Sequence, residues 1–360
     1  MCAMRNLRLR QSIGIVNKKG AVEFFRANVR RNFELKTKFE YLPELLSLFD
    51  GTKNIIEVSE EFDGIDSQQL RSLASALEEE YVLIDQDIPY PLDMLEERYR
   101  LINLLEDFFH SSSEVLHAVK ELRKRTVMIF GLGAVGSYMA TYLAKTGIGN
   151  LVLVDSDYVE LSNLHRQYFF EDEIGINKAE ALKSKILNFD SQINIDVISE
   201  KLDEDFFNSN HLPDSIDLII NCADEPSVDQ TSRIIAKFSM KKSIPHIVGG
   251  GYNLHLTLIG QTIIPYKTAC YKCFEVALSD LNTKELNGVR KLHRASRKLG
   301  SFSPLSGIAA NLAALDAFKI LIGSFESLQQ TNKRIEFSLH NHNFKTMEIE
   351  RNPDCEWCKA

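Results

Sequence analysis

Two groups of residues in this 360-residue chain have types and spacings that suit chemistry. The first is a glycine-rich stretch, Gly131-Leu-Gly133-Ala-Val-Gly136, with several charged residues after it. The second consists of two CxxC pairs, Cys270 with Cys273 and Cys355 with Cys358, separated by 81 residues. A glycine loop at the start of a helix cradles phosphates, and two CxxC pairs supply the four sulfur ligands of a tetrahedral zinc site.

The glycine loop predicts a nucleotide site. Gly131 permits a tight turn, Gly133 lets phosphates approach the backbone, and Gly136 allows close packing of helix on strand. Asp155 ends the next apolar stretch, 19 residues after Gly136, where a carboxylate binds a ribose hydroxyl. These features are common to dinucleotide enzymes, so an NAD-dependent oxidoreductase is one open interpretation.

The charged residues downstream favour a triphosphate. Arg166 and Lys178 are suited to neutralise β- and γ-phosphates, the arginine through its fork and the lysine as a point charge. Asp224 follows the apolar stretch 218–221, at the carboxyl end of a predicted strand, where it can hold Mg²⁺. We take these three as the catalytic candidates. The alternatives are a surface ion pair for Arg166 and a helix N-cap for Asp224.

The four paired cysteines predict a structural zinc site. The second pair lies at the end of the chain, which would fray unless it were tied down, and a closed set of four ligands leaves no catalytic position. The remaining cysteines are Cys2, in the N-terminal segment, and Cys222, at the end of a predicted buried strand. Cys222 is expected to be a core residue rather than a nucleophile.

Composition excludes several classes of protein. The chain is 44% hydrophobic and 26% charged, with a formal net charge of −8, which argues against a protein that coats nucleic acid. No apolar run approaches the roughly 20 residues of a membrane helix, and the basic first residues lead into no apolar signal segment. We therefore expect a cytoplasmic enzyme with no nucleic-acid or membrane partner.

From residue 126 onward the pattern alternates between short apolar strands and helices. The predicted strands are 127–130, 151–154, 195–198, 218–221 and 246–248, and the predicted connecting helices are 135–146, 175–189 and 227–240. Near-continuous apolar strands are typical of a parallel sheet buried on both faces. The fold class predicted is α/β, a doubly wound, Rossmann-like, mostly parallel sheet, over residues 125–360.

The region before it predicts a different, smaller domain. Strands are expected at 7–15 and 22–29, followed by about three helices and a strand at 82–84, which indicates an α+β winged-helix module over 1–88. Residues 89–124 are assigned to a linker and helices. Ten Lys and Arg against three Glu in residues 1–40 suit an acidic peptide added as an extra strand. A winged helix that only packs or binds DNA is the alternative.

The larger domain resembles the ThiF/MoeB/E1 activating enzymes over residues 98–360. The resemblance is carried by the glycine loop, Asp155, Ser162-Asn-Leu-His-Arg166-Gln, Lys178, Ala223-Asp224 and the two CxxC pairs. It implies ATP and Mg²⁺ as cofactors, adenylation of a carboxylate, and a homodimer. The further ATP-binding residues it implies are Asp157, Ser162, Asn163 and Gln167.

Departures from the family pattern bear on the substrate. No cysteine lies between Cys273 and Cys355, so a thioester intermediate is not expected. A basic run occupies this region instead, and its candidate substrate or phosphate contacts are Arg290, Lys291, His293 and Arg294. A solvated charged face is the alternative for that run. Arg98, with Arg100 as a substitute, is the candidate for reaching the ATP of a partner subunit.

The stretch Leu46-Ser-Leu-Phe-Asp-Gly-Thr-Lys-Asn-Ile-Ile-Glu-Val, followed by Leu77 and Val82-Leu-Ile, resembles the peptide-clamp domains of enzymes that mature ribosomally made peptides. Together the two resemblances imply ATP-dependent activation of a carboxylate of a precursor peptide, bound by the N-terminal domain, in peptide antibiotic biosynthesis. The carboxylate would be a glutamate side chain of an acidic peptide, as in the pantocin type, or the peptide C-terminus, as in the microcin C7 type. Adenylation of a ubiquitin-like sulfur-carrier protein is the main alternative.

Overall fold

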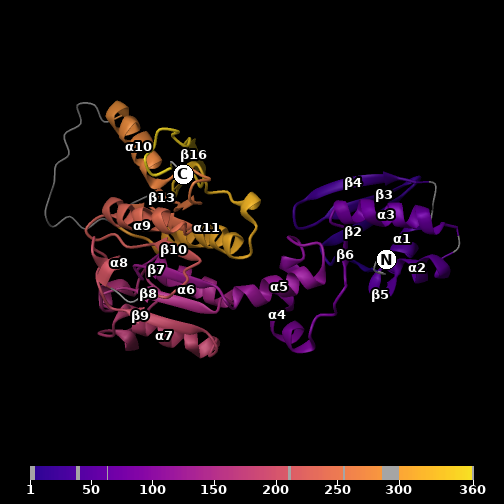
Figure 1. Cartoon of the computed structure of the whole chain (residues 1–360), viewed down its shortest axis with the longest axis horizontal. Helices are drawn as coiled ribbons and strands as arrows, with labels where there is room; N and C mark the ends of the chain where they lie inside the picture. Colours follow the sequence, from indigo (N-terminus) through magenta and orange to yellow (C-terminus); the bar gives the residue numbers. More distant parts are fainter. Residues whose placement is uncertain are drawn as a thin grey trace. The chain divides into compact units, whose positions relative to one another are not determined.

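The computed structural model describes residues 5–37, 41–62, 64–209, 212–253, 256–285 and 300–358. The chain forms two compact units, residues 1–120 and 121–360 (Figure 1). The division between them falls inside the segment 89–124, for which the sequence predicts a linker and helices. Each unit has its own sheets and its own core.

The first unit contains two small antiparallel sheets. One has the order β5-β1-β6 and the other the order β2-β3-β4. The strands are β1 (Asn6–Leu9), β2 (Ile13–Lys18), β3 (Ala21–Arg26), β4 (Arg31–Lys36), β5 (Asp50–Asn54) and β6 (Leu83–Asp85). The helices are α1 (Leu42–Ser47), α2 (Ile55–Glu61), α3 (Ser67–Glu79), α4 (Leu92–Leu105) and α5 (Ser112–Leu122).

Alternation of side chains builds the core of this unit. Val22 and Phe24 point inward from β3, and Phe24 stacks on Phe33 of β4 with ring centroids 4.9 Å apart. Two of the helices begin where the sequence provides capping boxes, at Asn54 for α2 and Asp66 for α3. These local signals explain why short segments of moderate hydrophobicity adopt fixed helices.

The predicted small α+β domain is confirmed, but its strands were incompletely predicted. The single strand expected over 7–15 is wrong, because the chain breaks at Arg10 and its two halves join different sheets as β1 and β2. Strands β4 and β5 were not predicted. Both are rich in exposed polar residues, so the alternation that identifies a strand is weak in them.

The second unit is built on a six-stranded sheet with the order β14-β11-β10-β7-β8-β9 (Figure 1). All neighbours are parallel except β11 and β14, which are antiparallel. The strands are β7 (Thr126–Phe130), β8 (Asn150–Val154), β9 (Asn194–Ile198), β10 (Leu218–Asn221), β11 (His246–Val248) and β14 (Gln261–Ile263). The predicted doubly wound, mostly parallel sheet is therefore confirmed.

Helices cover both faces of this sheet, as right-handed crossovers require. One face carries α6 (Gly136–Lys145), α7 (Lys178–Phe189) and α11 (Ser303–Leu321), and α6 packs against both α7 and α11. The other face carries α8 (Phe206–Ser209), α9 (Val228–Lys242) and α10 (Tyr271–Glu285). Phe207 of α8 stacks on Phe238 of α9 with centroids 3.8 Å apart, which fixes these two helices together.

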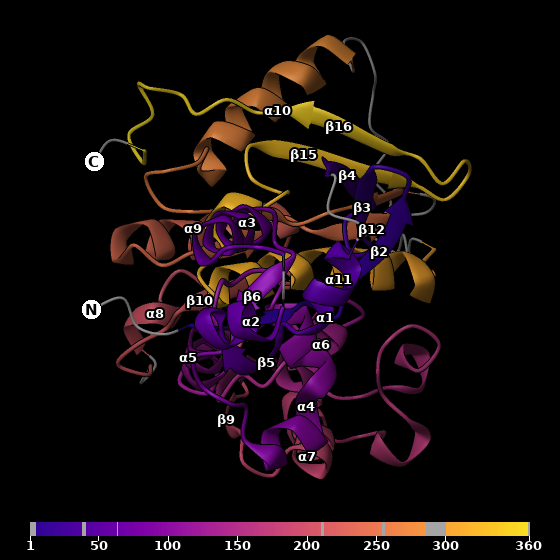
Figure 2. The same cartoon turned by 90° about the vertical axis from the view of Figure 1, so that its right-hand side faces the viewer.

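A second, antiparallel sheet follows the first. Its order is β12-β13-β15-β16, from β12 (Gly251–Asn253), β13 (Leu256–Leu258), β15 (Lys333–Ser338) and β16 (Phe344–Glu348). Figure 2 shows β15 and β16 running side by side. This sheet was not predicted, because its strands are short and β13 pairs with a strand some 75 residues later in the chain.

Helix α11 is the one described helix long and apolar enough to span a membrane by length and composition. More than half of its most apolar window is buried inside the second unit, at 56%. It also contains Asp316, which is 1% exposed and accepts a hydrogen bond from Thr262 Oγ1 at 2.9 Å. These contacts are those of a core helix.

Candidate nucleotide and zinc sites

The glycine loop connects β7 to α6 and packs directly against neighbouring backbone. Gly131 has a φ of 76°, and a Cβ there would lie 2.5 Å from the nitrogen of Ala223. A Cβ on Gly136 would lie 1.9 Å from the carbonyl oxygen of Gly131. Both positions therefore need glycine for the fold itself. A Cβ on Gly133 would meet only Gln167 Nε2, at 3.7 Å, so packing does not require glycine there.

Asp155 joins the end of β8 to this loop. One carboxylate oxygen accepts a hydrogen bond from Leu132 N at 2.6 Å and the other accepts one from Asp157 N at 2.8 Å. Burial raises the pKa of the Asp155 carboxyl, and the charge of Lys178 acts in the opposite direction. Each oxygen retains a further lone pair, so the carboxylate can accept a ribose hydroxyl while it holds the loop.

Lys178, the first residue of α7, is 6% exposed and donates from Nζ to Asp157 Oδ2 at 2.8 Å. Asn177 fixes its position. The Asn177 side chain caps α7 and donates to the carbonyl oxygens of Asp155 at 3.0 Å and Asp157 at 3.1 Å. Asn177 was not predicted as a site residue, although an asparagine directly before an expected helix is a recognisable capping signal.

The segment between β8 and α7 contains the short helices η1 (Leu161–Asn163) and η2 (Glu171–Glu173). Asn163 is buried and accepts from Glu160 N at 3.0 Å. The Arg166 guanidinium donates to Ser162 O at 2.7 Å, and among the described residues no carboxylate forms an ion pair with it. Gln167 is buried; its Nε2 is the side-chain atom next to Gly133, and its Oε1 has no hydrogen-bond partner among the described residues.

The turn after β10 carries Asp224. Asn221 holds this turn, because it accepts from Ala223 N and donates to Thr231 Oγ1, both at 3.0 Å. Asp224 itself is exposed. The N-cap of α9 is Ser227, so the capping role considered for Asp224 is wrong and its carboxylate is available for a cation. Asn221 therefore positions this turn. It was not predicted, because its partner Thr231 lies ten residues later on a helix and the contact is not visible in the local sequence.

Strand order brings these groups to one edge of the sheet. The strands β10, β7 and β8 are adjacent and parallel, so their carboxyl ends lie together. The glycine loop follows β7, Asp155 follows β8, and the turn of Asp224 follows β10. Ligands of doubly wound proteins bind in this position. The glycine loop, the carboxylate of Asp155 and the exposed carboxylate of Asp224 therefore lie at one edge of the sheet.

Cys222 also lies in this turn, but its chemistry is unlike that of a nucleophile. Burial, with a smaller effect of Asp224, raises the pKa of its thiol to about 12. The thiol is therefore neutral at physiological pH, and a neutral thiol is a poor nucleophile. This supports the interpretation of Cys222 as a packing residue.

The two CxxC pairs converge in the core of the second unit. All four cysteines are buried, and their sulfur atoms lie within 4.8 Å of one another. The separations are 3.8 Å for Cys270–Cys273, 3.6 Å for Cys270–Cys355 and 3.5 Å for Cys273–Cys358. A tetrahedral zinc with bonds of about 2.3 Å places its sulfurs about 3.8 Å apart, whereas a disulfide requires about 2.05 Å. The cluster fits zinc.

The remaining predicted contacts lie outside the described residues or in the first unit. Arg290, Lys291, His293 and Arg294 lie outside the described residues. Arg98 lies in the first unit at a break in α4, where its backbone has a φ of −137° and a ψ of 19°. Arg100, the substitute, donates to Tyr99 Oη at 2.9 Å. A contact of Arg98 or Arg100 with a partner's nucleotide stays a prediction.

Comparison with known proteins identifies the family. The family model described as ThiF matches residues 104–357, most of the chain. The chain belongs to the ThiF family. It is accordingly an ATP-dependent adenylyltransferase, and the family resemblance found in the sequence is confirmed. An ATP-dependent adenylyltransferase leaves the NAD-dependent oxidoreductase without support.

Individual relatives extend this result. The molybdopterin-synthase adenylyltransferase of Escherichia coli K12 is 29% identical over 265 residues, covering 72% of this chain and 95% of the relative. A crystal structure of E. coli MccB with ATP superposes with a TM-score of 0.77 at 23% identity, covering 98% of this chain and 99% of that one. PaaA superposes with a TM-score of 0.73 at 22% identity, covering 95% and 100%. The MccB-type fold thus includes the N-terminal unit.

Proposed function

We propose that this ThiF enzyme adenylates a carboxylate of a ribosomally made precursor peptide in peptide antibiotic biosynthesis. The observation that carries the proposal is the extent of the likeness to MccB, which includes the N-terminal unit at 98% of the chain. The match to the molybdopterin-synthase enzyme, by contrast, covers 72%. MccB is named as the microcin C7 biosynthetic enzyme, and it has been solved in complex with N-formylated MccA.

The N-terminal unit offers edges to which a peptide can add. In the described part of that unit, β2 and β4 each pair only with β3, so each leaves an edge of unpaired backbone groups. An extended peptide binds such an edge through main-chain hydrogen bonds, and side-chain pockets nearby give specificity. We assign the peptide-recognition role to this unit on that basis.

The second unit would hold the nucleotide at the edge of its parallel sheet. The amides of the Gly131–Gly136 loop face the phosphates, and Asp155, with Asp157, Ser162, Asn163 and Gln167 nearby, positions the ribose. Lys178 is already neutralised by Asp157, so a phosphate must share or replace that partner. Arg166, bound only to a carbonyl oxygen, needs no such exchange.

The reaction proposed is an in-line displacement at phosphorus. An oxygen of the peptide carboxylate attacks the α-phosphorus of ATP, the bond from that phosphorus to the bridging oxygen breaks, and pyrophosphate leaves. Arg166 and Lys178 balance the charge that develops on the phosphates. Asp224 is the residue that would hold Mg²⁺, which neutralises phosphate charge when bound. Positioning supplies the rest of the rate, since no protein nucleophile is used.

The excess of Lys and Arg in residues 1–40, together with the basic run 290–298, favours an acidic peptide. This preference points to a glutamate side chain as the activated carboxylate, with the peptide C-terminus as the second choice. A nucleophile within the peptide would then attack the acyl-adenylate and release AMP. The cytoplasmic location and the homodimer expected from the sequence are kept as parts of this proposal.

A second candidate substrate is a ubiquitin-like sulfur-carrier protein. It is favoured by the identity to the molybdopterin-synthase adenylyltransferase, which at 29% exceeds the identity to MccB. This interpretation gives no function to the N-terminal unit. Most of that unit lies outside the family match, which covers residues 104–357. We therefore rank it second.

The test is ATP–pyrophosphate exchange by the full-length enzyme with zinc and Mg²⁺ present. The added substrates are synthetic peptides encoded beside the gene, each with every Glu in turn replaced by Gln, and separately a sulfur-carrier protein with a diglycine tail. Exchange that depends on a peptide supports the proposal, and the Glu whose replacement abolishes exchange is the activated one. Exchange with the carrier alone would establish the second candidate.

Two variants make this test specific. Lys178→Met should reduce exchange by about 100-fold or more, because it removes a charge that acts on the phosphates. Lys183→Met is the matched control, since Lys183 lies on the same helix, and its exchange should equal that of the wild type. Full exchange in Lys178→Met would remove the mechanism.

A further inference from the structure

The N-terminal unit contains an arginine cluster that the adenylation chemistry does not use. Arg8 lies on β1, Arg10 directly follows that strand, and Arg26 ends β3. The guanidinium carbons of Arg10 and Arg26 lie 5.0 and 5.1 Å from the ring centroid of Tyr81. One aromatic ring thus contacts two cations.

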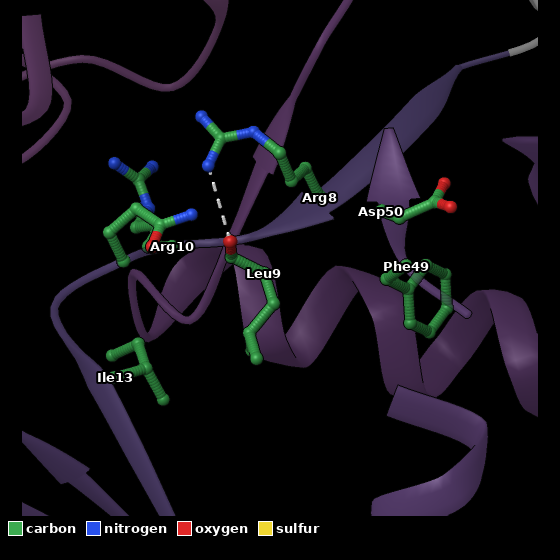
Figure 3. A pocket seen from close by; sticks show the side chains of 7 residues that line it. Arg8, Leu9, Arg10, Ile13, Phe49 and Asp50 are labelled. Carbon is green, nitrogen blue, oxygen red and sulfur yellow. Dashed lines mark hydrogen bonds between the residues drawn. The ribbon is translucent and has the colours of Figure 1, made fainter. Parts of the chain in front are cut away.

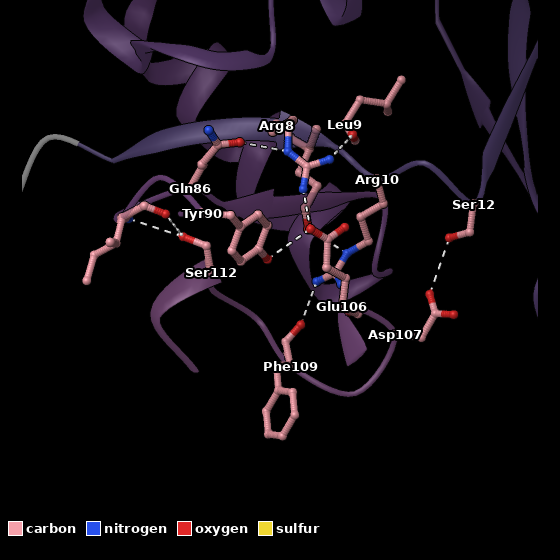
Figure 4. A network of polar contacts seen from close by, with 12 residues as sticks. Arg8, Leu9, Arg10, Ser12, Gln86, Tyr90, Glu106, Asp107, Phe109 and Ser112 are labelled. Atoms are coloured by element: carbon pink, nitrogen blue, oxygen red, sulfur yellow. Dashed lines mark hydrogen bonds and ion pairs between the residues drawn. The ribbon is translucent and has the colours of Figure 1, made fainter. Parts of the chain in front are cut away.

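Arg8 has a counterion within the unit. Its guanidinium forms an ion pair with Glu106 and donates to Gln86 Oε1 at 2.7 Å. Glu106 also accepts a hydrogen bond from Tyr90 Oη at 2.9 Å, as Figure 4 shows. The charge of Arg8 is therefore neutralised by contact.

Arg10 is held differently. It is 2% exposed, and its guanidinium donates to backbone carbonyl oxygens, including Leu83 O at 3.1 Å. Figure 4 shows its bond to Phe109 O, at 2.9 Å. Among the described residues no carboxylate forms an ion pair with it. Burial lowers the pKa of Arg10, whereas the charges of Glu106 and Asp107 nearby act in the opposite direction. The cation is fixed in place without a contacting counterion.

Arg26 has fewer polar contacts than Arg10 among the described residues. Its Nε is buried without a hydrogen-bond partner, and no acidic side chain of the described segments forms an ion pair with it. It lies opposite Ile13 in the β2–β3 ladder and shares the inward face with Phe24. A partly buried charge without a partner is costly, and a second cation on the same ring adds repulsion. An anion between these groups would relieve both costs.

A pocket of about 320 Å³ opens beside these arginines. It is lined by Arg8, Leu9, Arg10, Gln11, Ile13, Phe49 and Asp50 (Figure 3). Leu9, Ile13 and Phe49 give it apolar walls. Arg26 does not itself line the pocket, but it is the direct cross-strand neighbour of Ile13, which does. Asp50 and Arg10 lie on opposite sides of Leu9, so the two ends of the pocket differ in charge.

We propose that this pocket binds an Asp or Glu side chain of the substrate peptide, with Arg26 and Arg10 as its counterions. The apolar walls contact the methylene groups of the bound residue. The negative charge of Asp50 disfavours a more highly charged anion such as phosphate. A singly charged carboxylate fits a pocket that has arginines at one end and an aspartate at the other. That the carboxylate belongs to a peptide rests on the proposed function.

The test uses the full-length enzyme without ATP, so that it is independent of adenylation. The probes are N-acetyl-glutamate α-amide, the neutral isostere N-acetyl-glutamine α-amide, and inorganic phosphate at the same ionic strength. Binding is followed by NMR of the arginine Nε–Hε groups, with the Arg26 signal identified by its loss in Arg26→Lys. The Arg26 signal should shift saturably with the glutamate probe and not with the other two.

Affinity for the glutamate probe is then measured by calorimetry in charge variants. Arg26→Met should weaken it about tenfold or more, and Arg26→Lys, which keeps the charge but loses the fork, should weaken it less. Arg30→Met removes an equal charge from the exposed turn after β3 and should leave the affinity unchanged. Unchanged melting temperatures establish that each variant is folded.

Three results would overturn the proposal. They are equal binding of the glutamate and glutamine probes, a response to phosphate alone, and unchanged affinity in folded Arg26→Met or Arg26→Lys. Any of them would leave the adenylation proposal standing, because exchange depends on the other unit. Loss of exchange with intact probe binding would conversely remove the proposed function and keep the pocket.

Discussion

At the residue scale, the sequence predicts which side chains form the site but not which of them share charge. Lys178 and Asp157 were both assigned to ATP, and the structure shows that they pair with each other at 2.8 Å. Arg166 was assigned to phosphate, and its guanidinium instead contacts a carbonyl oxygen. Such pairings depend on how a loop turns in space. Asn177 holds the loop here through hydrogen bonds to two backbone carbonyl oxygens. No spacing of residues in the sequence reveals such bonds.

Gly136 lies against neighbouring backbone, and Gly133 has room beside it for a Cβ. This difference gives a prediction at the scale of single residues. Gly136→Ala should destabilise the enzyme by about 3 kcal/mol or more, because its Cβ would overlap the backbone oxygen of Gly131. Gly133→Ala should leave the melting temperature unchanged, since its Cβ makes only an ordinary contact, and should weaken ATP binding if phosphates approach there. Thermal unfolding and ATP titration of both variants separate the effects. Unchanged ATP affinity in Gly133→Ala would remove that residue from the site.

At the scale of elements, predictability follows burial. The five predicted strands of the parallel sheet were found within a residue of their bounds, because strands covered on both faces must be continuously apolar. The antiparallel strands β12, β13 and β14 escaped detection because three-residue strands carry too little pattern, and β15 and β16 escaped it because few of their residues are buried. The zinc cluster was predictable because each CxxC pair is a local sequence motif. Its two cysteines lie close together whatever the rest of the fold.

Zinc should stabilise the end of the chain on the core, a prediction at this scale. Cys355→Ser removes one of four sulfur ligands, so it should lower the zinc content of the enzyme and its melting temperature by on the order of 10 °C. Cys222→Ala is the matched control, because that thiol lies outside the cluster, and it should retain zinc, stability and activity. Metal analysis and thermal unfolding measure both. A wild-type enzyme without zinc would refute the assignment.

His246 on β11 gives the parallel sheet a pH dependence. Burial lowers the pKa of this imidazole to about 4, and its Nε2 has no partner. An unfolded histidine titrates near 6.5, so the unfolded state binds more protons between those values. Stability contributed by the neutral ring is present above about pH 6.5 and is lost as the pH falls toward 4, by about 3 kcal/mol at most.

The corresponding measurement is the free energy of unfolding by urea across this pH range. In His246→Gln the slope over pH 4 to 6.5 should decrease, because the group that takes up the proton is gone, whereas His340→Gln should not change it. An identical slope in the wild type and in His246→Gln would show that other groups control acid unfolding.

At the scale of the whole molecule, the sequence predicts a small N-terminal domain for peptide recognition and a larger domain for adenylation. The chain likewise divides into two compact units. The division at residue 120 is later than the predicted domain end at 88, since α4 and most of α5 contact the first unit. This was not visible beforehand because the ties are single polar contacts, such as Arg8 with Glu106, between residues almost 100 positions apart. Most of the first unit lies outside the family match at residues 104–357, and the proposed function assigns substrate specificity to this unit.

This division predicts that ATP binding and peptide dependence are separable. A chain that begins at Ser111 keeps α5 whole together with all of the second unit, and so retains the glycine loop, Lys178 and the zinc cluster. It should bind zinc and ATP with affinities within about threefold of the full chain, a difference of less than about 0.7 kcal/mol. Its pyrophosphate exchange should no longer respond to the peptide, because the edges of β2 and β4 and the arginine pocket are gone. Zinc content and a cooperative melting transition serve as the controls for folding. Exchange that still depends on the peptide would place recognition in the second unit and contradict the assignment of the first.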